Sequence, residues 1–89
     1  MAKSDISWRR LSPEGEKVEV YAHHLGDQWK FFTRGGRYDQ WRAVANPPLE
    51  DWLALLDAIR RRIGRGSLRP EELGRVERTI RERFPEAQF

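Results

Sequence analysis

The sequence predicts an α+β fold: an antiparallel β-meander of three or four strands, followed by two α-helices packed on one face of the sheet. Up to Ala45, β-branched and aromatic residues alternate with polar ones and are interrupted by glycine-containing turns, which is the pattern of short antiparallel strands. From Pro48 onward, apolar residues recur every three or four positions, as on the buried side of an amphipathic helix. A chain of 89 residues fits a single domain, 1–89, with one core.

The first two strands are expected at residues 6–11 and 16–25. The segment between them, Ser-Pro-Glu-Gly, has the composition of a turn. In the second strand apolar residues stand at every second position, so one face of this strand is apolar. These residues are Val18, Val20 and Ala22.

A third strand is expected at residues 28–34, joined to the second by a two-residue turn at Gly26-Asp27. This turn places Leu25 opposite Gln28 and therefore Tyr21 opposite Phe32. The pairing separates two faces, because side chains alternate along a strand. The core face carries Val18, Val20, Ala22, Trp29 and Phe31, and the outer face carries Glu19, Tyr21, His23, Lys30, Phe32 and Arg34.

A fourth strand is expected at residues 37–45 after a tight turn at Gly35-Gly36, where glycine supplies positive φ angles. Its register has two alternatives. A three-residue bulged turn places Trp41 beside Trp29 in the core and Tyr38 beside Phe32 on the outer face, whereas a two-residue turn reverses this assignment. The bulged turn is preferred because it buries Trp41.

Two helices are expected at about residues 48–64 and 70–84. Asn46 is predicted to cap the first helix, Pro47 and Pro48 to start it, and the glycines at 64 and 66 to end it. Its apolar stripe comprises Leu49, Trp52, Leu53, Leu56, Ile59 and Ile63. The stripe of the second helix comprises Leu73, Val76, Ile80 and Phe84. On its exposed side, Glu71 with Arg75 and Glu77 with Arg81 form four-residue pairs.

Composition and spacing argue against several classes of function. The chain has no cysteine, which excludes disulfides and thiolate metal sites. Neighbouring His23 and His24 point to opposite faces of a strand and do not converge on one metal ion. No paired carboxylates, nucleophile motif or phosphate loop is present, so we expect no enzyme activity, no metal and no cofactor. The absence of a signal-peptide-like or membrane-spanning apolar run predicts a soluble, cytoplasmic protein.

The outer face is the leading candidate binding surface. Aromatic and basic side chains interleave on it, a combination that can stack nucleic-acid bases and neutralise phosphates. The alternative is that these rings are buried, either under the second helix or against a partner subunit. The candidate residues are Tyr21, His23, Lys30, Phe32, Arg34, Tyr38 and Arg42.

A second candidate is an arginine cluster. Within ten residues that contain no acidic side chain stand Arg60, Arg61, Arg62, Arg65 and Arg69. These side chains are suited to clamp a nucleic-acid backbone. The alternative is that they form the solvated end of the first helix, where they complement its dipole and pair in part with Asp57 through Arg61.

The sequence therefore predicts a small non-catalytic binding domain that acts through protein association, as a homodimer or an adaptor subunit. The alternative is nucleic-acid binding, single- or double-stranded, through the outer face and the arginine cluster. A meander followed by a helix, with aromatic and basic residues on the open sheet face, is similar in element order to the single-strand-binding transcription coactivators. Three strands followed by a helix also occur in integrase arm-binding domains. No functional residue is carried over from either group.

Overall fold

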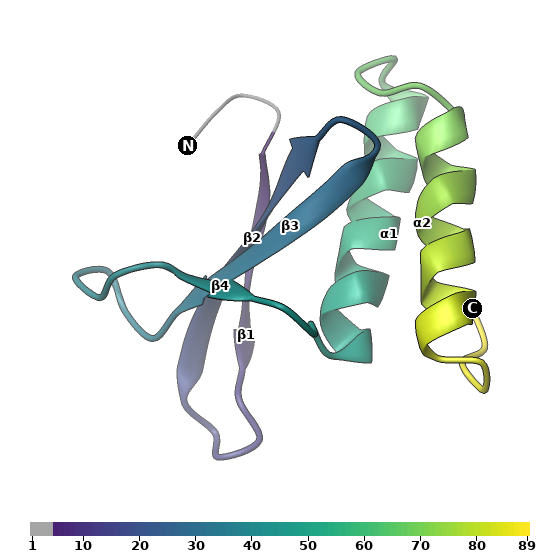
Figure 1. Ribbon diagram of the computed structural model, residues 1–89. Coiled ribbons are helices and arrows are strands. Elements are labelled where there is room, and N and C mark those ends of the chain that lie inside the picture. Colours follow the sequence, from purple (N-terminus) through teal and green to yellow (C-terminus); the bar gives the residue numbers. More distant parts are fainter. Residues whose placement is uncertain (1–4) are drawn as a thin grey trace. The chain divides into compact units, whose positions relative to one another are not determined.

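The computed structural model describes residues 5–89, in which four strands precede two helices (Figure 1). The strands are β1 (Ile6–Leu11), β2 (Lys17–Leu25), β3 (Gln28–Arg34) and β4 (Arg42–Val44), and the helices are α1 (Leu49–Gly64) and α2 (Glu71–Arg83). The chain divides into two compact units, a sheet unit that ends at Pro47 and a helical unit over Pro48–Phe89. The predicted α+β class, with an antiparallel meander followed by two helices, is confirmed.

The sheet has the order β1-β2-β3-β4, and every neighbouring pair is antiparallel. β2 and β3 form the long hairpin in Figure 1. At its turn Gly26 has a φ of 64°. Within the described residues only glycines have a positive φ, so the φ of Asp27 is negative. A positive φ at the first turn residue and a negative φ at the second are the pattern of a type II′ turn. Leu25 pairs with Gln28 and Tyr21 with Phe32, as the sequence predicts.

The buried apolar residues of the sheet lie on the predicted core face. Val20 pairs with Trp8, and Ala22 pairs with both Ile6 and Phe31, so these residues share one side. Trp8 meets Phe31 edge to face, with 6.2 Å between ring centroids. The fully or nearly fully buried members are Ile6, Val20, Ala22 and Phe31.

The predicted fourth strand is wrong in both length and register. β4 has only three residues, and Phe32 pairs with Ala43, not with Tyr38 as the bulged turn requires. The strand thus enters the sheet five residues later, and an odd shift exchanges the two faces. Gly35 and Gly36 lack the positive φ of a tight hairpin, and the backbone N–H of Asp39 donates to the carbonyl of Gly36 at 3.0 Å. A loop over residues 35–41 therefore replaces the predicted turn.

The two helices lie side by side and antiparallel within the helical unit (Figure 1). Their buried side chains follow the predicted stripes, and Asp51, Leu55, Ala58 and Glu72 are buried in addition. The buried apolar residues are Trp52, Leu55, Leu56, Ala58, Ile59, Val76 and Ile80. Among residues 5–89 no helix is long and apolar enough to cross a membrane.

The boundaries of the helices depart from the sequence prediction at two points. Asn46 does not cap α1, because Pro48 is the extended flanking residue, with a φ of −68° and a ψ of 159°. A residue that precedes proline, as Asn46 and Pro47 do, is disfavoured in helical backbone. At the other end Gly66 has a φ of 78° and the N–H of Ser67 donates to the carbonyl of Arg62, which is a Schellman motif. In α2, Arg75 donates to Glu72 at 2.7 Å, not to the predicted partner Glu71.

Candidate binding face of the sheet

Three aromatic side chains form a cluster on the outer face, which we call the outer aromatic cluster: Tyr21, Phe32 and Trp41. Cross-strand pairing places Tyr21 directly opposite Phe32, and their rings stack with 4.6 Å between centroids and 14° between planes. Trp41, which precedes β4, meets Tyr21 edge to face at 4.7 Å. All three side chains are half-buried. The cluster is thus packed within itself and still presents part of its surface to solvent.

The predicted position of Trp41 in the core beside Trp29 is wrong. Its contacts with Tyr21 and Arg34 place it on the outer face. The reason is that β4 begins only at Arg42, so Trp41 belongs to the preceding loop and not to a strand. Trp29 lies on the core face and stacks on His24 at 4.5 Å.

Arg34 holds this cluster in place. Its guanidinium lies over the Trp41 ring, 4.4 Å from the centroid. The same group donates a hydrogen bond from Nε to Oε2 of Glu19 at 3.0 Å, and its Nη2 forms an ion pair with the same oxygen at 2.9 Å. Both ion-pair partners are about three-quarters buried, with side-chain exposures of 23% and 24%. Because Glu19 neutralises it, Arg34 positions Trp41 and contributes little free positive charge to the face.

His23 is also engaged within the protein. Its Nδ1 lies 2.6 Å from Oδ1 of Asp5, whose side chain is only 6% exposed. Lys30, which pairs with His23 across the hairpin, is exposed. It makes no ion pair within residues 5–89. Of the predicted basic residues, Lys30 is therefore the one that offers its charge to a ligand on this face.

Two predicted members of the face lie elsewhere. Tyr38 is 92% exposed and stands on the loop, not beside Phe32. Arg42 pairs with Thr33, so its side chain belongs to the opposite face of the sheet. Both departures follow from the register of β4. The candidate surface keeps Tyr21, His23, Lys30, Phe32 and Arg34 from the sequence prediction.

Three basic residues that sequence reasoning missed flank the outer aromatic cluster. Arg9 pairs with Glu19, and Lys17 pairs with Leu11, which puts both side chains on the outer face. Arg37 stands on the loop that follows β3. All three are exposed, and none makes an ion pair inside the described part of the chain. The period of two along the second predicted strand would have found Lys17, and its extension across the turn at residues 12–15 would have found Arg9.

The arginine cluster belongs to the helical unit. Arg61 pairs with Asp57, as the dipole-compensating interpretation predicts, and Arg60 lies 3.9 Å from Glu77. Arg65 and Arg69 are exposed between the two helices. At least two of the five arginines thus have acidic partners within this unit, which reduces the charge that the cluster presents.

The histidine and acidic side chains, which could serve in catalysis or metal binding, do not come together in one site. His23 and His24 lie on opposite faces, as predicted. In the described range 5–89, no group of three or more His, Asp or Glu side chains is placed to hold a metal ion. The arrangement on the outer face is instead one of rings and free cations. Comparison of the chain with protein-family models, with curated proteins and with solved structures found no match in any of the three.

Proposed function

We propose that this protein is a non-catalytic nucleic-acid-binding domain that holds single-stranded DNA or RNA on the outer face of its sheet. The observation that carries the proposal is the juxtaposition of the half-buried outer aromatic cluster with cations that have no acidic partner within residues 5–89. Aromatic rings stack on exposed bases, and free cations neutralise phosphates. Since the bases of a single strand are accessible for stacking, a strand fits this face better than a duplex does.

The charges on the face favour a polyanion over a second copy of the protein. Two acidic residues next to the cluster are engaged, Glu19 by Arg34 and Asp5 by His23, whereas Asp39 is exposed on the loop over residues 35–41. The cations without partners in the described chain stand on both sides of the rings: Arg9, Lys17, Lys30 and Arg37. A symmetric dimer through this face would bring like charges together.

The proposal is tested by fluorescence anisotropy of a labelled single-stranded oligonucleotide and a labelled duplex, each titrated with the protein at two salt concentrations. We expect tighter binding of the single strand. The logarithm of its affinity should fall by about 0.7 per phosphate contact for each logarithmic unit of salt. Absence of binding at low salt would overturn the proposal. A wild type that then sediments as a dimer would favour protein association.

A matched pair of charge variants locates the bound strand. Lys30→Gln removes an exposed cation from the outer face, and Arg42→Gln removes one from the opposite face. We expect Lys30→Gln to lower the salt slope by about 0.7, the loss of one phosphate contact, and Arg42→Gln to leave it unchanged. Equal effects of the two variants would contradict binding on the outer face.

Phe32→Ala, checked for folding by circular dichroism, is expected to weaken binding by loss of a stacking surface worth about 1–3 kcal/mol.

A further inference from the structure

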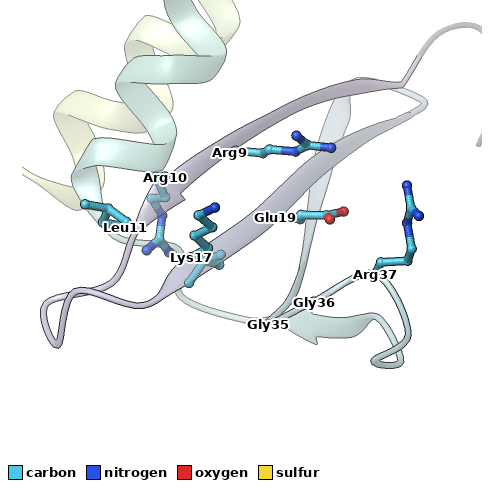
Figure 2. Close-up of a pocket in the computed structure, with 9 residues that line it drawn as sticks. Arg9, Arg10, Leu11, Lys17, Glu19, Gly35, Gly36 and Arg37 are labelled. Atoms are coloured by element: carbon cyan, nitrogen blue, oxygen red, sulfur yellow. The ribbon is translucent and has the colours of Figure 1, made fainter.

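A pocket of about 520 Å³ opens at the end of the outer face, between the ends of β1 and β2 and the loop that follows β3. Its walls include the side chains of Arg9, Lys17 and Arg37 and the backbone of Gly35 and Gly36. Figure 2 shows Arg9 and Glu19 extending from neighbouring strands toward the same side, with Arg37 beside them on the loop. The volume lies within the range of small-molecule sites, about 300–1,000 Å³.

The pocket carries an excess of positive charge. Arg9, Lys17 and Arg37 have no ion-pair partner within residues 5–89. The acidic residue in its lining is Glu19. Arg34, which is outside the pocket, already holds its Oε2 atom through one hydrogen bond and an ion pair. Because Glu19 is thus neutralised, the three cations Arg9, Lys17 and Arg37 attract an anion. The fourth cationic residue of the lining, Arg10, pairs with Val18 and so belongs to the core face of the sheet. Two of the three cations are arginines, whose planar guanidinium groups bind phosphate through paired hydrogen bonds.

Two glycines, Gly35 and Gly36, form part of the pocket lining. Neither Gly35 nor Gly36 has a positive φ, so the backbone at these positions does not require glycine. A Cβ at Gly36 would have an ordinary contact, 3.8 Å, with Oδ2 of Asp39, whereas one at Gly35 would approach the same atom to 3.0 Å. The two glycines add no side chain to the lining, which also includes the apolar residues Leu11 and Val18. A group larger than a bare anion, with an apolar or planar part, fits this combination.

We propose that this pocket binds the phosphate group of a nucleotide, with Arg9, Lys17 and Arg37 as its ligands. The inference rests on the proposed function, since it identifies the end of the outer face as a place where one phosphate of the bound strand is held. The phosphate comes either from the terminus of a strand or from a free mononucleotide. Both sources present the same dianionic monoester to the three cations.

The test uses nitrogen-15 NMR, because the amides of Gly35 and Gly36 report from the pocket itself. The protein is titrated with thymidine 5′-monophosphate, with thymidine, and with inorganic phosphate. We expect the two glycine resonances to move with the mononucleotide and more weakly with inorganic phosphate, and to stay unmoved with thymidine. Unmoved resonances with the mononucleotide, or equal shifts with thymidine, would overturn the pocket as a phosphate site.

Variants connect the shifts to the named cations. Arg9→Gln and Arg37→Gln each remove one charge from the pocket, and Arg42→Gln removes one from the opposite face. We expect either pocket variant to weaken mononucleotide binding about tenfold, the loss of one charge-assisted hydrogen bond, and the control to bind as the wild type does. Wild-type affinity in both pocket variants would overturn the assignment.

Oligonucleotides with and without a 5′-phosphate separate the two proposals. Tighter binding of the phosphorylated strand, lost in Arg37→Gln, identifies the strand terminus as the source of the phosphate. Equal binding of both strands, with no response to the mononucleotide, would overturn the pocket and leave the proposed function standing. Binding of the mononucleotide without binding of any strand would support the pocket and overturn the proposed function.

Discussion

At the scale of single residues, Arg34 has a different role from the one its sequence position suggests. As an outer-face arginine it is expected to contact a ligand, and instead it bridges Glu19 and Trp41. A lysine would keep the charge and lose both the planar contact with the ring and the contact of two guanidinium nitrogens with Glu19. The arginine is therefore a structural element of the outer aromatic cluster.

The neighbours Phe31 and Phe32 test the assignment of the two faces. Phe31 is 2% exposed on the core face, whereas Phe32 is half-buried on the outer face. We expect Phe31→Ala to lower the free energy of unfolding by about 3–5 kcal/mol, the cost of a large cavity in a core, and Phe32→Ala to lower it by clearly less. Urea denaturation followed by circular dichroism measures both. A larger loss for Phe32→Ala would mean that the outer face is the core.

At the scale of elements, α2 is a polar helix that contains one glycine. Gly74 is exposed, lies inside the helix, and a Cβ built on it meets no atom within 4 Å. The position has no visible need for glycine, in contrast to Gly66, whose φ is 78° at the end of α1. Glycine inside a helix is unfavourable because of its backbone entropy.

Substitution of these two glycines by alanine should therefore have opposite effects. We expect Gly74→Ala to raise the free energy of unfolding by about 0.5–1 kcal/mol, which is the gain in helix propensity. Gly66→Ala should lower it by about 1–2 kcal/mol, because it forces a residue with a Cβ into left-handed backbone. Thermal or urea denaturation of the two variants is the measurement. Destabilisation by Gly74→Ala would show that a partner group packs against this position.

At the scale of the whole molecule, the tryptophans stand in different environments. Trp8 and Trp29 lie on the core face of the sheet, Trp41 lies on the outer face, and Trp52 is buried in α1. The net charge of +3 is small, so the proposed binding of a polyanion would depend on where the cations stand and not on their total number. Of these four tryptophans, Trp41 is the one that forms part of the proposed binding surface.

Trp41 should accordingly report the binding of a strand. We expect an added single-stranded oligonucleotide to change the tryptophan emission of the wild type. Trp41→Phe should remove most of that change, because Trp41 is the tryptophan that belongs to the outer aromatic cluster, on which we propose that bases stack. Trp29→Phe, on the opposite face, is the matched control and should retain it. A change that survives Trp41→Phe and disappears in Trp29→Phe would move the ligand to the other face of the sheet.

Local sequence rules, such as turn length and strand periodicity, were sufficient to predict which side chains share a face wherever a short turn joined two regular elements. The two-residue turn at Gly26-Asp27 and the period of two along β2 and β3 determined which side chains share each face, and Tyr21 opposite Phe32 follows from these rules alone. The spacing of apolar residues likewise determined the two helices, because each must bury one stripe.

Tertiary structure alone decided the part of the face built by the loop at residues 35–41. The path of a loop of this length is not set by any local turn rule. In this loop Trp41 contacts Tyr21 on β2 and Arg34 on β3, which belong to other segments of the chain. The same loop brings Arg37 beside Arg9 and Lys17 and so forms the pocket. Sequence periodicity assigns faces within a strand, whereas a site assembled from three separate segments depends on how the chain returns to the sheet.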